Sequence, residues 1–117
     1  MPEDEFPKLN PEETIIREDK AKHVLHGGQT KQGGTLVLTD QRLLFGRHTS
    51  FLFFLFKDTR VDLDVELSQI KKVDTEGMLR KSLVVGYSVN GNYESDVFSV
   101  SNVDEWESKL KELVVEN

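Results

Sequence analysis

Apolar and polar residues alternate along much of the chain with the two-residue period of β-strands. From Val61 to Leu67 the alternation has no fault, because Val and Leu occupy one set of positions and Asp and Glu the other. That pattern is typical of an antiparallel strand with one buried and one solvent-exposed face. The sequence also becomes typical of strands from His23 onward. Further apolar runs of strand length cover residues 35–39, 42–45, 70–73, 83–89 and 93–100. The pattern therefore predicts about seven strands.

Two short polar segments predict tight hairpins between these strands. Asp40 and Gln41 separate the runs at 35–39 and 42–45, and the Asp40 side chain can bond to the backbone of its own turn. Asn90-Gly91 separates the last two runs, and this dipeptide suits a turn in which both positions need positive φ.

The last segment changes to a helical period. Asn102 and Glu105 have the spacing of a capping box, and the pairs Glu105–Lys109 and Glu107–Lys111 are spaced for ion pairs on an exposed face. The opposite, apolar face gathers Val103, Trp106, Leu110, Leu113 and Val114. One amphipathic helix is thus expected to follow the strands and to close a core that the sheet alone would leave open.

The N-terminus carries mixed signals. Its prolines and acidic residues cannot bury much surface, so we expect a loose acidic tail over residues 1–13 and one domain over residues 14–117. Asn10, followed by Pro11, Glu12 and Glu13, nevertheless predicts the start of a short helix.

The amino-acid composition limits the classes of protein to which the chain can belong. The chain has 117 residues, 37% of them hydrophobic and 31% charged, which suits a single globular module. It has no cysteine, so disulfides, thiolate metal sites and cysteine nucleophiles are excluded. No apolar run approaches the roughly 20 residues of a membrane span, and the first residues are acidic where a signal peptide would be basic. We therefore expect a cytoplasmic protein.

Charge is distributed unevenly along the chain. The formal net charge is -6, which argues against nucleic-acid binding because that depends on a surplus of Lys and Arg. Residues 41–81 differ from both ends, because they are net positive and contain five of the seven Phe residues. A basic and aromatic middle between acidic ends is where we expect a partner-facing surface.

The main anomaly is a run of six consecutive apolar residues, Phe51 to Phe56, flanked by cations. Both faces of any strand there would be apolar, which an exposed edge strand should avoid. Three interpretations remain open: a segment folded over the core, a surface for another protein or a second copy of the chain, or a membrane-inserting loop. The candidate contact residues are Phe51, Leu52, Phe53, Phe54 and Phe56, with Arg47, Lys57 and Arg60 as a charged rim.

Candidate catalytic and metal-binding groups are sparse. His23 and His26 would lie on opposite faces of a strand, so a shared metal ion is not expected. Glu94 and Asp96 share one strand face and are expected to face solvent rather than to form a catalytic pair. We therefore expect neither an enzyme nor a cofactor or metal site.

The hairpin from Gly34 to Phe45 resembles the hallmark G-x-L-x-L-T-x-x-R-L-x-F of GRAM domains, a branch of the pleckstrin-homology (PH) superfold. The matching residues are Gly34, Leu36, Leu38, Thr39, Arg42, Leu43 and Phe45. Residues 18–23 resemble prokaryotic members of the family, and residues 65–73 and Trp106 are also similar. The likeness covers roughly residues 14–115 and suggests a small stand-alone member.

The resemblance implies a mainly β, PH-like fold: a seven-stranded β-sandwich or partial barrel capped by one C-terminal α-helix. Within the hairpin, we expect Arg42 to brace a turn or a carbonyl rather than to bind a ligand. PH domains that bind lipids carry basic side chains near their first strands, and Lys20, Lys22 and Lys31 occupy that region here. The second strand supplies no Arg, which argues against a tight inositol-phosphate pocket.

These observations together suggest a non-catalytic binding module. Our hypothesis is a cytosolic adaptor of GRAM type that docks on a membrane surface, as a peripheral membrane protein, or on a protein partner through the basic, Phe-rich segment. The alternative is a structural or self-associating domain in which that segment is core or a homo-oligomer interface.

Overall fold

The computed structural model describes residues 9–25, 28–47, 60–77 and 80–116. These residues form seven strands, a 3-10 turn and one α-helix. The strands are β1 (Ile15–Leu25), β2 (Thr30–Thr39), β3 (Arg42–Arg47), β4 (Arg60–Glu66), β5 (Ile70–Glu76), β6 (Ser82–Val89) and β7 (Asn92–Val100). The 3-10 turn η3 covers Leu67–Gln69, and the helix α1 covers Val103–Glu116. The expected mainly β architecture with a C-terminal helix is confirmed.

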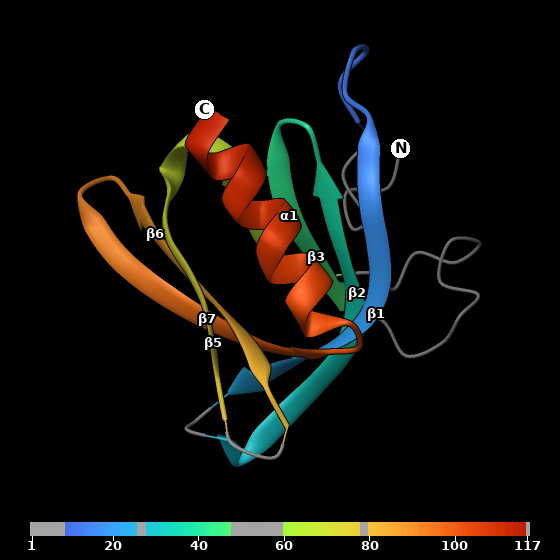
Figure 1. Ribbon diagram of the computed structural model, residues 1–117, viewed down its shortest axis with the longest axis vertical. Coiled ribbons are helices and arrows are strands. Elements are labelled where there is room, and N and C mark those ends of the chain that lie inside the picture. Colours follow the sequence, from blue (N-terminus) through green and yellow to red (C-terminus); the bar gives the residue numbers. More distant parts are fainter. Residues whose placement is uncertain (1–8, 26–27, 48–59, 78–79, 117) are drawn as a thin grey trace.

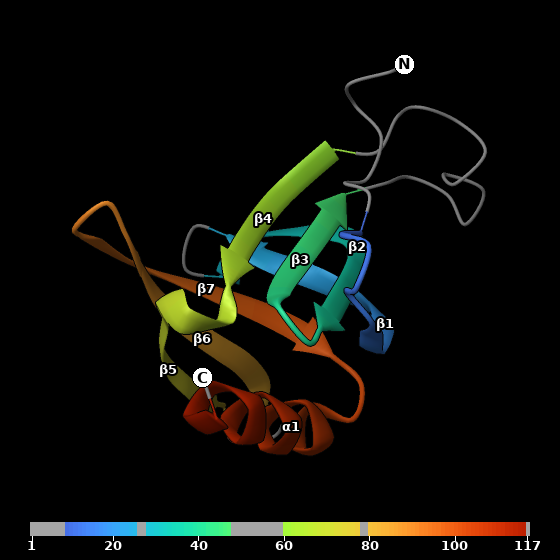
Figure 2. The ribbon, with the colours of Figure 1, turned by 90° about the horizontal axis from the view of Figure 1, so that it is seen from above.

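The seven strands form one antiparallel sheet in the order β4-β3-β2-β1-β7-β6-β5. β1 joins the two halves, because it pairs with β2 along its whole length but with β7 only from Ala21 to Val24. The sheet bends at this short seam, so that the halves face each other and α1 lies along the open side between them (Figures 1 and 2).

The core lies between the two half-sheets and the helix. Its largest fully buried side chains are Trp106 from α1, Phe45 from β3 and Phe98 from β7. The alternation predicted for β4 is confirmed, since Leu63, Val65 and Leu67 are buried and the acidic residues between them are not. The helical face is also confirmed: Trp106 and Leu110 have no exposed surface, and Val103, Leu113 and Val114 pack against the core.

The β2–β3 hairpin turns where the sequence predicts, but a different side chain holds it. The Thr39 hydroxyl accepts hydrogen bonds from the backbone N–H groups of Gln41 and Arg42, both at 3.0 Å. Asp40 does not bond to its own turn: its carboxylate accepts the Thr14 N–H at 3.1 Å and so ties β1 to the hairpin. The second predicted turn is confirmed, with φ of 54° at Asn90 and 82° at Gly91.

The helix predicted to begin at Asn10 does not form. Residues 10–13 make a single turn, closed by the Glu13 N–H bonding to the Asn10 carbonyl, and β1 follows at Ile15. Ile15 and Ile16 are β-branched and favour a strand. The sequence assigns this turn to the loose tail, but the buried Glu13 side chain holds it against the domain.

Helix α1 differs from prediction in its surface contacts. Glu107 and Lys111 form the expected ion pair at 3.0 Å. Glu105 instead bonds to Arg17 of β1 at 3.0 Å, and Lys109 lies 3.4 Å from Glu112. Asn102 adopts a left-handed conformation, with φ of 58°, and its carbonyl accepts the N–H groups of Glu105 and Trp106. Among the described residues, no helix is both long and apolar enough to cross a membrane.

Candidate functional site

The connection between β3 and β4 is where the sequence places its candidate contact surface. Arg47 ends β3, Arg60 begins β4, and the two residues are partners in the register of the antiparallel pair. The intervening candidates lie outside the described residues: Phe51, Leu52, Phe53, Phe54, Phe56 and Lys57. Their role as a contact surface stays a prediction.

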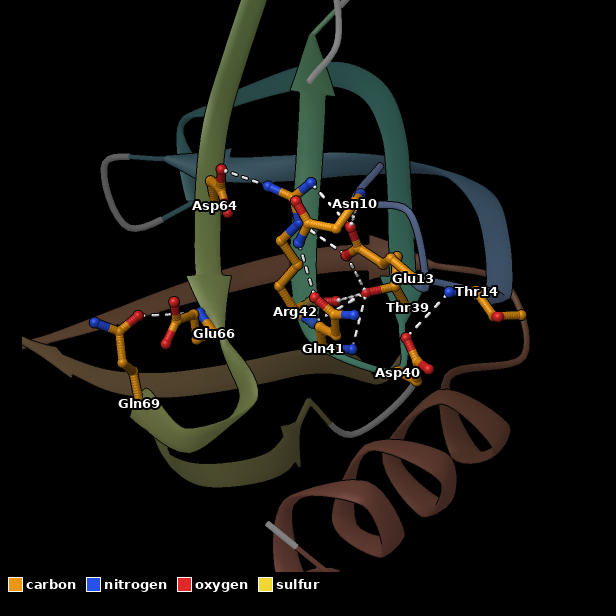
Figure 3. A network of polar contacts seen from close by, with 10 residues as sticks. All are labelled: Asn10, Glu13, Thr14, Thr39, Asp40, Gln41, Arg42, Asp64, Glu66 and Gln69. Carbon is orange, nitrogen blue, oxygen red and sulfur yellow. Dashed lines mark hydrogen bonds and ion pairs between the residues drawn. The ribbon is translucent and has the colours of Figure 1, made fainter. Parts of the chain in front are cut away.

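Arg42 is the centre of a polar cluster at the other end of β3. Its guanidinium binds both carboxylate oxygens of Glu13, with Nε at 2.8 Å from Oε2 and Nη2 at 3.1 Å from Oε1. Its third nitrogen, Nη1, donates to Asp64 Oδ2 of β4 at 3.1 Å. Figure 3 shows the guanidinium lying between the two carboxylates. Arg42 therefore joins three segments: the N-terminal turn, β3 and β4.

The Glu13 carboxylate is stabilised in its charged form. Chiefly because of the hydrogen bonds from Arg42, its pKa is lowered to about 2, although burial acts in the opposite direction. The Thr39 hydroxyl donates to Oε2 at 2.6 Å, and the Asn10 N–H donates to Oε1 at 2.9 Å. The ion pair with Glu13 also raises the pKa of Arg42. Arg42 is thus a brace, as expected, and it binds the carboxylates of Glu13 and Asp64.

An open polar pocket of about 450 Å³ lies beside this cluster. It is lined by Asn10, Asp40, Gln41, Arg42, Asp64, Glu66 and Ser68. The one cation in this lining, Arg42, already pairs with Glu13 and Asp64, so the pocket offers an anion little uncompensated positive charge.

A second polar group lies in the core, where β1, β6 and β7 meet. His23 Nε2 lies 2.9 Å from Asp96 Oδ1, and the Tyr87 hydroxyl donates to Asp96 Oδ2 at 2.5 Å. The His23 ring stacks on Phe98, with centroids 4.9 Å apart. Burial, followed by the bond to Asp96, raises the pKa of Tyr87, so its phenol stays protonated.

This arrangement corrects the expectation for Asp96. The carboxylate turns inward to bond to the buried His23 and the half-buried Tyr87, whereas Glu94 on the same strand is exposed, as expected. Sequence reasoning could not find the pairing, because His23 and Asp96 are 73 residues apart and no motif links them. The group supports the seam between β1 and β7, and all three side chains already have hydrogen-bonding partners.

The three lysines near the first strands share one exposed sheet face. Lys20 and Lys22 of β1 pair in register with Thr35 and Gly33 of β2, and Lys31 pairs with Val24. Directly opposed residues of antiparallel strands point to the same side, so all three lysines lie on that side. Among the described residues, no cluster of three or more His, Cys, Asp or Glu is placed to hold a metal ion.

Comparison with known proteins identifies the fold. No protein-family model matches the chain, and no curated protein matches it in sequence. Solved structures match well: the Vps36 N-terminal PH domain has a TM-score of 0.67 at 19% identity, over 97% of this chain and 88% of that one. The Slm1 PH domain, solved in complex with inositol-4-phosphate, has a TM-score of 0.62 at 21% identity, over 86% and 97%.

A third similar structure is the PDZ-RhoGEF DH/PH segment in complex with activated RhoA. Its TM-score is 0.68 at 12% identity; the match covers 87% of this chain but only 29% of that one. At these identities the likeness shows the fold alone. The chain has a PH-like fold: one sheet of seven antiparallel strands with a single C-terminal helix.

Proposed function

We propose that this protein is a non-catalytic binding module, a cytosolic adaptor that docks on a membrane surface or a protein partner through its basic, Phe-rich segment. The apolar contacts are assigned to Phe51, Leu52, Phe53, Phe54 and Phe56, and the charged rim to Arg47, Lys57 and Arg60. The observation that carries the proposal is the run of six consecutive apolar residues between two strands whose facing ends are both Arg.

The class of module is supported by the fold. PH-like neighbours have been solved with inositol-4-phosphate and with activated RhoA, which are a lipid headgroup fragment and a protein. Within this fold, we assign the chain to the GRAM branch because of the hairpin from Gly34 to Phe45, which contains every fixed position of the hallmark motif.

The location of the segment supports a contact role. The register pairs Arg47 with Arg60, so two cations stand at the base of the connection that carries the Phe residues. Insertion of one Phe contributes about 1.5–3 kcal/mol, and each cation near an anionic bilayer about 1 kcal/mol. Two or three rings with such a rim would give reversible, peripheral binding of about the strength of a single acyl anchor.

Vesicle sedimentation tests the proposal. We expect the wild-type chain to pellet with anionic vesicles more than with neutral ones, and the Phe53→Asp/Phe54→Asp variant to stay in the supernatant. The matched control is Ile15→Asp/Ile16→Asp, which likewise replaces two apolar side chains by Asp, at two exposed residues of β1. This control should lose far less binding.

Three results would contradict part or all of the proposal. If no vesicle composition pellets the wild-type chain, the membrane version is wrong and a protein partner remains. If the Phe variant changes only the molar mass in solution, the segment is a homo-oligomer interface. If the variant loses its β-sheet circular dichroism, the segment belongs to the core and the contact proposal fails.

A further inference from the structure

Among the residues that the structure describes, nothing pairs with the outer edge of strand β5. It is the last strand of its half-sheet and pairs only with β6, on one side (Figure 2). The Thr75 N–H is bonded by the carboxylate of its neighbour Asp74, with N and Oδ1 2.8 Å apart, at an exposed position. This side-chain bond places the Thr75 N–H on the open edge rather than in the ladder with β6.

The same edge presents the backbone of Val73. In an antiparallel pair, the N–H and C=O of one residue point to the same side, and alternate residues share a side. The ladder of β5 with β6 is regular from Lys72 onward, so Val73 presents its N–H and C=O to the open edge as Thr75 does. Helix α1 packs against β5, yet the Thr75 N–H remains exposed.

The charges along β5 are self-complementary. Lys71 and Lys72 precede Val73, whereas Asp74 and Glu76 follow it, and all four charged side chains are exposed. If two copies of this strand run antiparallel with Val73 opposite Val73, Lys72 of each copy lies directly opposite Asp74 of the other. Such opposite-charge pairs stabilise a sheet, whereas like charges in the same positions destabilise it.

The charges on the other edge strand, β4, are not self-complementary. On β4, Asp62, Asp64 and Glu66 occupy the charged face. Antiparallel pairing of two β4 strands centred on Asp64 would place acid opposite acid at every one of these positions. Charges normally protect an edge strand against pairing, and a row of acids like that on β4 is suited to this role. On β5 the change of sign halfway along the strand removes that protection.

We propose that β5 is a docking edge for a second copy of this chain. The two β5 strands pair antiparallel about a two-fold axis at Val73, and the Val73 N–H groups bond to the Val73 carbonyls of the opposite copy. Asp74 releases the Thr75 N–H and pairs with Lys72 of the second copy, twice by symmetry. The two seven-stranded sheets thereby become continuous through an isologous interface.

The interface is small, which sets the strength of the dimer. One pair of seven-residue strands buries less than the roughly 1,200–2,000 Å² of a stable complex. We therefore expect a reversible dimer that dissociates on dilution. Sedimentation equilibrium from about 10 μM to 1 mM covers the range in which such an association is measurable.

Charge reversal gives a specific test. Lys72→Asp and Asp74→Lys each place like charges opposite one another, so each should weaken the dimer by about tenfold or more. The double variant K72D/D74K restores opposite charges and should dimerise as the wild type does. An equimolar mixture of the two single variants should form a heterodimer, because both facing positions would be acidic in the K72D copy and basic in the D74K copy.

Circular dichroism provides the folding control for each variant. The proposal is overturned if the wild type is monomeric throughout the concentration range. It is also overturned if the single variants dimerise as the wild type does, or if an equimolar mixture of the two forms no heterodimer. Loss of self-association in Phe53→Asp/Phe54→Asp with full retention in K72D would place the interface in the Phe-rich segment instead.

Discussion

Glu13 shows how one buried side chain can make the stability of the whole chain depend on pH. Its pKa is lowered from 4.5 to about 2 in the folded state, mainly because Arg42 holds the charged form. The stabilisation is therefore complete above pH 4.5 and is lost as the pH falls through about 2. A shift of this size corresponds to about 1–3 kcal/mol once partial screening near the surface is allowed for.

Replacing Glu13 with Gln should remove this pH dependence. We expect urea denaturation to show that the free energy of unfolding of the wild type falls by about 1–3 kcal/mol more than that of E13Q between pH 5 and pH 2. At pH 7 the variant should be the less stable protein, because Arg42 loses its buried partner. Parallel pH profiles for the two proteins would contradict this assignment.

Two neighbouring glycines of β2 should respond in opposite ways to the same substitution. A methyl group on Gly34 would collide with the Gly46 carbonyl oxygen and come within 2.7 Å of Phe45 Cζ, whereas one on Gly33 would meet nothing within 4 Å. Gly34→Ala should therefore cost about 1–3 kcal/mol, because backbone and a core ring must move. Gly33→Ala serves as the matched control and should be nearly neutral. Equal thermal stability of the two variants would show that β3 can shift to accommodate the added methyl group at little cost in stability.

At the scale of elements, local signals predicted most of the fold. The strand at 61–67, the turn at Asn90-Gly91 and the apolar face of α1 each follow from residues close together in the sequence, and each is confirmed. The Asn10 signal failed because the Glu13 side chain, instead of serving a helix, binds Arg42, 29 residues further along the chain.

The candidate site was less predictable than the fold, because its contacts join residues that are far apart in the sequence. Arg42 could be recognised as a brace from its hairpin, but its partners Glu13 and Asp64 come from separate segments. The bonds from Asp96 to His23 and Tyr87 exist only once β1, β6 and β7 are assembled. Contacts made across the sheet leave no periodic trace in the sequence.

Helix α1 is held chiefly by one side chain. Trp106 is fully buried, its Nε1 donates to Asp19 Oδ2 at 2.9 Å, and Arg17 lies over its ring. Trp106→Ala should cost about 3–5 kcal/mol, and Trp106→Phe about 1–2 kcal/mol through the lost hydrogen bond. As a control, Lys111→Ala removes only the exposed pair with Glu107 and should cost about 0.3–0.5 kcal/mol. Chemical denaturation should return this order, and a Trp106→Phe cost close to that of Trp106→Ala would show that the hydrogen bond outweighs packing.

At the scale of the whole molecule, the two proposed surfaces belong to opposite edges of the sheet. The Phe-rich connection precedes β4, and the proposed docking edge is β5. A dimer through β5 would carry two copies of the Phe-rich segment. Two linked contacts raise the apparent affinity for a surface without any new interaction, provided that both can reach it together.

If the dimer links two membrane contacts, a change of charge at Asp74 should affect vesicle binding in two opposite ways. Asp74→Lys adds two units of positive charge, so electrostatics alone should strengthen binding to anionic vesicles. The same change breaks the dimer, so loss of the second contact should weaken binding. We expect D74K to bind less well than the wild type at protein concentrations where the wild type is dimeric, and K72D/D74K, whose net charge equals that of the wild type, to recover full binding. Stronger vesicle binding by monomeric D74K would show that each chain engages the membrane independently, because the added charge would then be the dominant effect.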